Sequence, residues 1–336
     1  MNFKEYSPLS TKKVGFTTSF PVEVVFAAGL TPIDLNNIFI NNNPTELVRY
    51  AELKGFPRNI CAWIKGMYAV ICRHDIDTVV GIIQGDCSNT HSLMEILKDE
   101  GKGIIPFSYS WDRDKEFINR EISKLEALFG VTREQTEHTK RELDKVRAKL
   151  RYLDELTWKT NQVTAQENHY WLVSSSDFNT DYQAFGRELD VFLENIKQRE
   201  PMKTNLRLGF IGVPPILFDI YSFLQECGAS VVYNEVQRQF SMFYETDNIV
   251  EQYTKFTYPC DIFTRIHDIK TECILRDIDG LIAYTQSFCH RQLDIISLKK
   301  HIDIPILQLE ADKPDNLDSR TKLRIESFVE MLGERD

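Results

Sequence analysis

Seven cysteines are the residues of this chain best suited to metal or redox chemistry: Cys61, Cys72, Cys87, Cys227, Cys260, Cys273 and Cys289. Their number is odd and the chain is large, so a disulfide framework is not expected in a reducing compartment. No pair has C-x-x-C spacing, which removes the zinc-ribbon and ferredoxin signatures. Metal ligation at other spacings, a reactive thiol and inert burial remain open.

Two of these cysteines follow apolar strands in matching contexts. Cys87 lies three residues past Val79–Gln84, and Cys289 lies four residues past Gly280–Thr285. Open parallel sheets bind ligands beyond the carboxyl ends of their strands, so both thiols are expected at sheet edges that face one another across a cleft. Cys61 precedes an apolar stretch and is expected to reach the same cleft from a loop or a helix start. Burial of all three as small hydrophobic residues is the alternative.

The sequence around the other four cysteines gives weaker indications of a ligand role. Cys72, Cys227 and Cys273 stand where small buried hydrophobic residues belong, and we expect them to be structural. Cys260 lies on a turn, in Tyr258-Pro259-Cys260-Asp261, and both a structural and a ligand role stay open for it.

Polar groups near the predicted strand ends are further candidates. The segments 234–240 and 287–292 each place an Arg-Gln pair just beyond an apolar run. Such fixed donors suit an anionic or carbonyl-bearing ligand, and solvated side chains at a helix start are the alternative. Glu23 is a carboxylate inside an apolar stretch, so it either faces a cleft with a raised pKa or is held by a helix start.

Strands and helices alternate on both sides of a charged helical region. The strands are expected at Val14–Phe20, Val79–Gln84, Leu206–Val213, Val231–Tyr233, Gly280–Thr285 and Ile304–Leu309. This alternation predicts an α/β protein with two parallel-sheet domains and right-handed crossovers. We expect an N-terminal α/β domain over residues 1–110, a helical segment over 111–200 between or beside the domains, and a C-terminal α/β domain over 201–336.

Helix signals support this division. In the middle segment, apolar residues recur on one helical face at Leu143, Val146, Leu150 and Leu153. Thr132 with Gln135 three residues later is typical of a capping box. Elsewhere we expect helices over Val22–Ala28, from Pro214-Pro215 through Cys227, and over Arg320–Leu332.

Composition excludes several protein classes. The 336 residues suggest two or three domains, and 42% hydrophobic with 27% charged residues is ordinary globular composition, neither collagen-like nor disordered. A formal charge of −10 disfavours nucleic acid and anionic membrane surfaces as partners. No apolar run has the length of a membrane span, and Met1–Lys13 lacks the order of a secretory signal, so a cytoplasmic protein is expected.

Five segments in order resemble the 2-hydroxyacyl-CoA dehydratase and benzoyl-CoA reductase family. They run from near residue 14 to residue 332 and cover nearly the whole chain. They are Pro21–Pro32 (PVEVVFAAGLTP), Gly85-Asp86-Cys87, Asp279–Cys289, Gln308–Asp312 and Arg324–Phe328.

The resemblance implies a fold, a cofactor and partners. Family subunits have two flavodoxin-like α/β domains with added helices, and three cysteines hold a 4Fe–4S cluster between the domains. Carried over by motif, these ligands are Cys61, Cys87 and Cys289. The implied partners are an ATP-hydrolysing iron–sulfur activator, a second copy of the chain or a related subunit, and an acyl-CoA substrate.

The resemblance also implies a reaction class, in which the chain is a component of an anaerobic lyase or oxidoreductase. The cluster would support low-potential one-electron chemistry on an acyl-CoA thioester. Such chemistry needs a nearby base or acid, for which Glu23 is our hypothesis. His290 is a second candidate, or a hydrogen-bond donor to the cluster. Two alternatives stay open: a double-cubane 8Fe–9S cluster in an ATP-coupled reductase of small molecules, and a non-catalytic iron–sulfur scaffold or electron-transfer partner. The acyl group remains undefined.

Overall fold

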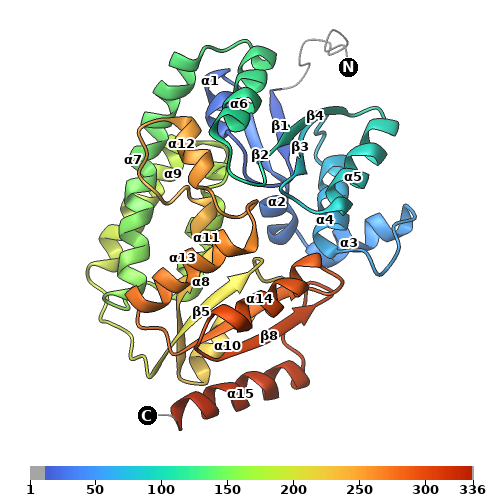
Figure 1. Ribbon diagram of the computed structural model, residues 1–336. Helices are drawn as coiled ribbons and strands as arrows, with labels where there is room; N and C mark the ends of the chain where they lie inside the picture. Colours follow the sequence, from blue (N-terminus) through green and yellow to red (C-terminus); the bar gives the residue numbers. More distant parts are fainter. Residues whose placement is uncertain (1–11, 335–336) are drawn as a thin grey trace. The chain divides into compact units, whose positions relative to one another are not determined.

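The computed structural model describes residues 12–334, so most of the polar amino end Met1–Lys13 lies outside the described residues. The chain forms two compact units, each built on its own sheet (Figure 1). The first unit contains the chain up to Val146, Ser176–Tyr182 and Tyr244–Cys260. The second contains Arg147–Ser175, Gln183–Phe243 and the chain from Asp261 onward.

The first unit has a four-stranded parallel sheet in the order β2-β1-β3-β4. Its strands are β1 Lys13–Phe16, β2 Thr31–Asp34, β3 Thr78–Gln84 and β4 Gly103–Ser108. Its helices are α1 Val22–Ala27, α2 Leu35–Asn41, α3 Pro44–Leu53, α4 Ala62–Arg73, α5 Ser88–Asp99, α6 Lys115–Phe129 and α12 Ile249–Lys255, with the 3-10 turn η2 Phe178–Thr180. In β3, the residues Thr78–Ile82 are buried, as expected for an interior strand covered on both faces.

The second unit repeats this arrangement with the strand order β6-β5-β7-β8, again all parallel. Its strands are β5 Leu206–Gly212, β6 Ala229–Asn234, β7 Gly280–Gln286 and β8 Ile306–Ala311. Its helices are α8 Ala165–Ser174, α9 Tyr182–Ile196, α10 Ile220–Glu226, α11 Glu235–Phe240, α13 Ile262–Leu275, α14 Asp294–His301 and α15 Ser319–Gly333, with the 3-10 turn η3 His290–Leu293. Strand β7 is buried along its whole length, and α15 runs beside β8 (Figure 1).

The predicted fold class, α/β with two parallel-sheet domains, is confirmed. The long helix α7 Arg133–Trp158 carries residues of both units. Its predicted apolar face is buried at Leu143, Val146, Leu150 and Leu153. Its predicted cap is also present, because Thr132 N–H donates to Gln135 Oε1 at 2.8 Å and Gln135 N–H donates to Thr132 Oγ1 at 3.3 Å.

The helix predicted to start at Pro214-Pro215 is wrong in its first turns, since α10 begins only at Ile220. The intervening chain is held extended by partners far along the sequence. Leu217 forms a parallel bridge with Asp315, and Phe218 N–H donates to the Asp315 carbonyl at 3.0 Å. These bonds occupy backbone groups that a first helical turn would need.

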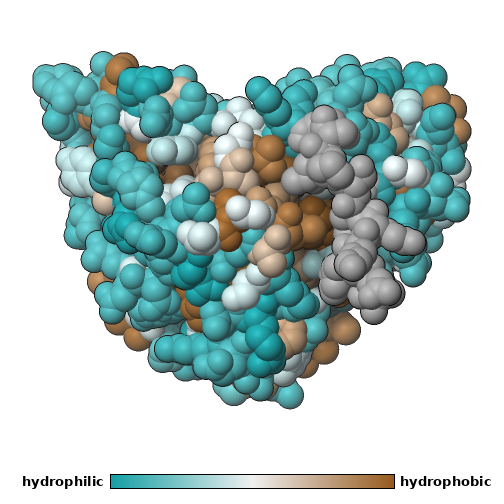
Figure 2. Space-filling view, turned by 90° about the horizontal axis from the view of Figure 1, so that it is seen from above, coloured by the Kyte–Doolittle hydropathy of each residue, from teal (hydrophilic) through white to brown (hydrophobic). Residues whose placement is uncertain are grey.

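Hydrophilic side chains cover most of the face shown in Figure 2. Within residues 12–334, no helix combines the length and the apolar character needed to cross a membrane.

Candidate functional site

The first unit places Cys61 and Cys87 at the starts of two helices. Cys61 is the N-cap residue of α4 and Cys87 is the N-cap residue of α5, and neither thiol forms a side-chain cap bond. Both side chains are partly exposed. The positive end of a helix dipole favours a thiolate, so these are positions from which cysteine can bind a metal.

A tight turn presents Cys87 after β3. Gly85 has a φ of +100°, which favours glycine. Asp86 fixes the turn, because its carboxylate accepts from Cys87 N–H at 2.8 Å and from Thr90 Oγ1–H at 3.1 Å. Burial, followed by the charge of Asp86, raises the pKa of the Cys87 thiol. The free thiol is therefore a poor nucleophile at neutral pH, whereas a bound metal ion deprotonates a thiol outright.

In the second unit, Cys289 occupies the corresponding turn after β7 and is the N-cap residue of η3. Its N–H donates to the Gln286 carbonyl at 3.1 Å. The preceding residue, Phe288, is exposed and has a φ of +62°, a conformation unusual for an aromatic residue. His290 follows at the surface, where desolvation and the charge of Arg291 lower its pKa, so its imidazole is mostly neutral at pH 7.

Buried polar atoms with unmet hydrogen-bonding capacity lie close in sequence to these cysteines. Within residues 12–334, Thr285 Oγ1 and Gln286 Oε1, at the end of β7, have no hydrogen-bond partner. The same holds for Trp63 Nε1, two residues after Cys61. Buried polar groups usually have partners, and iron–sulfur sites accept hydrogen bonds at sulfur. Soft thiolates with hydroxyl and indole donors nearby are a donor set that fits an iron–sulfur cluster.

A small cavity of about 20 Å³ lies at the carboxyl ends of β5 and β7, and Thr285, Arg291 and Gln292 are among its lining residues. The predicted polar cluster 287–292 therefore contributes two side chains to a hollow beside the Cys289 turn. Arg291 is mostly buried and lies 3.7 Å from Asp294.

The convergence of three thiols on one centre stays a prediction. Among the described residues, no group of three or more Cys, His, Asp and Glu side chains is arranged to hold a metal ion. Cys61 and Cys87 belong to the first unit and Cys289 belongs to the second.

Glu23 is completely buried in the first turn of α1. Its carboxylate accepts hydrogen bonds from Gln252 Nε2 at 2.7 Å and from Tyr253 Oη at 2.8 Å, both on α12. Tyr253 Oη also lies 2.7 Å from the Phe20 carbonyl. The carboxylate therefore has partners from a helix far along the chain, and its predicted role in proton transfer stays a prediction.

The predicted donor cluster 234–240 has a different role from the one expected. Arg238 is buried and pairs with Asp268 and Glu272, the latter at 2.8 Å, so it is not a donor held for a ligand. It belongs to a buried ion-pair network on α13 that sequence reasoning missed. A sequence signal for this network was present, because charged residues recur at helical spacing at Arg265, Asp268 and Glu272 of α13 and at Arg276, its C-cap residue.

The three cysteines that were expected to be structural are partly buried side chains. Cys72, Cys227 and Cys273 are partly buried, and Cys273 packs against the core of the second unit. Burial, followed by Glu272, raises the pKa of Cys273 to about 12, so this thiol is protonated and unreactive at neutral pH.

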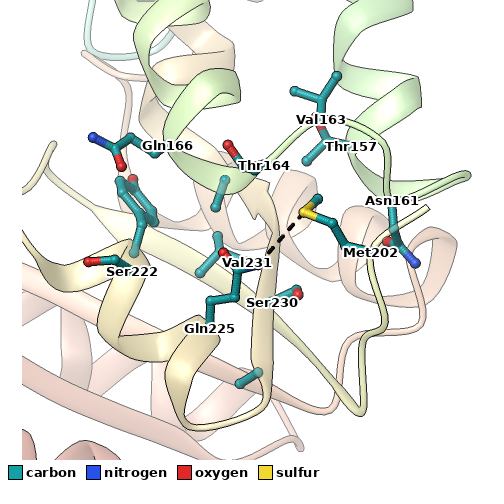
Figure 3. A pocket seen from close by; sticks show the side chains of 13 residues that line it. Thr157, Asn161, Val163, Thr164, Gln166, Met202, Ser222, Gln225, Ser230 and Val231 are labelled. Atoms are coloured by element: carbon teal, nitrogen blue, oxygen red, sulfur yellow. Dashed lines mark hydrogen bonds between the residues drawn. The ribbon is translucent and has the colours of Figure 1, made fainter. Parts of the chain in front are cut away.

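A larger pocket in the second unit lies away from the carboxyl ends of the strands. It has a volume of about 100 Å³ and includes Ala229, Ser230 and Val231, where β6 begins (Figure 3). Its lining side chains are neutral, and Gln225 Nε2 donates to Met202 Sδ across it at 3.8 Å. None of the predicted site residues lines this pocket.

Comparison with known families agrees with the order of the motifs. A search of curated proteins gave no match. The family model of the 2-hydroxyglutaryl-CoA dehydratase D-component matches residues 17–332. This span begins just after β1 and contains the other seven strands and all seven cysteines. The chain therefore belongs to the 2-hydroxyglutaryl-CoA dehydratase D-component family.

Proposed function

We propose that this chain is the iron–sulfur subunit of an acyl-CoA dehydratase or reductase, with Cys61, Cys87 and Cys289 as ligands of a 4Fe–4S cluster. The observation that carries the proposal is the shared position of these cysteines. Each is the N-cap residue of a helix or helical turn, and two of them follow central parallel strands. The family match over residues 17–332 supports the same class of protein.

When bound, such a cluster supplies a low-potential electron and a Lewis-acidic iron. The chain's own residues would hold and shield it. The Asp86 turn fixes Cys87, and the Gln286 carbonyl fixes the backbone of Cys289. Thr285 Oγ–H and Trp63 Nε1–H are donors without partners in the described part of the chain, suited to bonding cluster sulfur.

Proton transfer is the second task of the chain. His290, neutral at pH 7 and adjacent to Cys289, is the proposed group that exchanges protons with solvent. Glu23 is the proposed buried proton acceptor, and a proton placed on it would change its bonds to Gln252 and Tyr253. The proposed partners are an ATP-hydrolysing iron–sulfur activator, a second copy of the chain or a related subunit, and an acyl-CoA thioester.

The test is an electron paramagnetic resonance titration. The chain is purified without oxygen, reduced, and mixed with acyl-CoA thioesters of differing acyl groups or with free coenzyme A as the control. We expect a thioester to change the signal of the reduced cluster and free coenzyme A to leave it unchanged. Full iron loading without a response to any thioester would contradict a substrate site and favour an electron-transfer scaffold.

A further inference from the structure

The two units repeat one structural module, and the repeat extends to individual residues. Asp75-Ile76-Asp77 precedes Gln84 and Cys87 at the same spacing at which Asp277-Ile278-Asp279 precedes Gln286 and Cys289. Both first aspartates have a φ of +51° and lead from the preceding helix into the central strand.

Strand pairing follows the same correspondence. Phe16 in β1 pairs with Val80 in β3, and Phe210 in β5 pairs with Ile282 in β7. On the other side of β1, Phe16 pairs with Asp34 in β2, and on the other side of β5, Phe210 pairs with Asn234 in β6. Asp34 and Asn234 are each the N-cap residue of the next helix.

The repeat relates the turn that leads into α4 to the turn that leads into α13. In the first, Ile60 N–H donates to the Pro57 carbonyl at 3.2 Å, and in the second, Cys260 N–H donates to the Thr257 carbonyl at 3.0 Å. Cys61 is the N-cap residue of α4, and Cys260 stands one residue before Asp261, the N-cap residue of α13. Each of the two helix starts therefore has a thiol within one residue of its N-cap position, and each central strand is followed by another thiol, although the Cys260 turn itself belongs to the first unit.

Packing within the first unit places the Cys260 turn directly against the Cys87 turn. A Cβ atom added to Gly85 would lie 2.6 Å from Pro259 Cβ and 3.0 Å from Tyr109 Cβ. Pro259, the residue before Cys260, thus packs against Gly85, which stands two residues before Cys87. The ring of Tyr109 continues this contact to Phe256, with ring centroids 5.6 Å apart.

We propose that Cys260 is a fourth thiolate ligand of the iron–sulfur site, an inference that rests on the function proposed above. On binding, the Cys260 thiol loses its proton to solvent and a sulfur–iron bond forms, with no electron transferred. The hydrogen bond from Cys260 Sγ–H to the Phe256 carbonyl, 3.4 Å long, is broken. The fourth thiolate fills the coordination position that three cysteines leave open, so a substrate has to compete with it.

The alternative is that Cys260 only stabilises its turn through this hydrogen bond. Serine distinguishes the two roles, because a hydroxyl donates to the Phe256 carbonyl at least as well as a thiol but is a poorer ligand for iron–sulfur clusters. Cys72 is the matched control, since it is partly buried in the first unit and its thiol lies beside Tyr68 and 4.0 Å from Glu100.

The experiment compares the wild-type chain, Cys260→Ser, Cys260→Ala and Cys72→Ala, all loaded with cluster without oxygen. Each is exposed to limiting ferricyanide, and iron loss and the paramagnetic signal of a three-iron cluster are followed. We expect both Cys260 variants to lose one iron about tenfold faster than the wild type and Cys72→Ala. Oxidation of Cys260→Ser at the wild-type rate would overturn the proposal, whatever Cys260→Ala does.

A second measurement avoids dependence on the folding of variants. Alkylation of the wild-type chain, read by mass spectrometry, should protect Cys260 in the loaded protein and modify it once a chelator has removed the iron. Equal modification in both states would also overturn the proposal. Failure of the wild-type chain to bind any iron–sulfur cluster would instead refute the proposed function.

Discussion

At the scale of single residues, the second unit depends on arginines buried with carboxylates. Arg276 and Asp154 are each 1% exposed and lie 2.6 Å apart, and Arg276 also pairs with Glu272. The carboxylate of Asp154 raises the pKa of Arg276 against the opposing effect of burial. Sequence alone could not predict this pair, because Asp154 lies on α7 and Arg276 caps the end of α13, and no local pattern links the two residues.

Removing one member of this pair should destabilise the folded chain. Asp154→Asn leaves the buried Arg276 with only Glu272, a carboxylate that Arg238 shares, and we expect the free energy of unfolding to fall by about 3–5 kcal/mol. The matched control is Asp190→Asn, which breaks the exposed pair with Lys149 and should cost at most about 1 kcal/mol. Urea unfolding measures both, and equal losses would contradict a structural role for the buried network.

A buried carboxyl pair in the first unit should make stability depend on pH. Asp177 accepts from Asp34 N–H at 2.7 Å, and Asp34 accepts from Ser176 Oγ–H. Burial, followed by the charge of Asp34, raises the pKa of Asp177 to about 8, and burial also raises the pKa of Asp34. The folded state therefore binds more protons than the unfolded state between about pH 4 and pH 8.

Because the folded state binds more protons than the unfolded state in this pH range, raising the pH should reduce stability. The stability of the wild type relative to Asp177→Asn should fall as the pH rises through this window and level off above about pH 8. Thermal unfolding of both proteins from pH 5 to pH 9 measures the difference. A difference independent of pH would show that Asp177 is ionised in the folded state.

At the scale of elements, local patterns predicted strands better than loops. The apolar run Val79–Gln84 became β3 with one added residue, because burial on both faces requires such a run. The segment after Pro214-Pro215 was mispredicted because a distant partner, Asp315, holds it extended. Cys87 and Cys289 were predicted to follow strands, and they do, but the helix-start position of Cys61 was only one of two predicted possibilities.

The Gly85 turn offers a test of how elements pack around the candidate site. Gly85→Ala should destabilise the first unit by more than about 1–2 kcal/mol, because it combines a positive φ with a clash against Pro259. Gly29→Ala is the matched control, since Gly29 also has a positive φ but nothing lies within 4 Å of the added Cβ atom. Equal effects of the two substitutions on the free energy of unfolding would mean that the turn at Pro259 moves aside without a measurable loss of stability.

At the scale of the whole molecule, the chain is a duplicated parallel-sheet module with one added helical region. The fold class was predicted from the alternation of strands and helices, and the family from the order of weak motifs. The match over residues 17–332 confirms the family. The detailed correspondence between the units was not predicted, because it depends on strand register as well as sequence. The ligand set still rests on the motifs and on the position that the three cysteines share at helix starts.

The most direct test of the central claim is analysis of iron and acid-labile sulfide in the chain purified without oxygen. We expect about four of each per wild-type chain, and loss of most of both in Cys87→Ser and Cys289→Ser. Cys72→Ala should keep the wild-type content. About eight irons per chain would indicate a double-cubane cluster instead. Wild-type iron content in both ligand variants, or a wild-type chain without iron after reconstitution, would contradict the account.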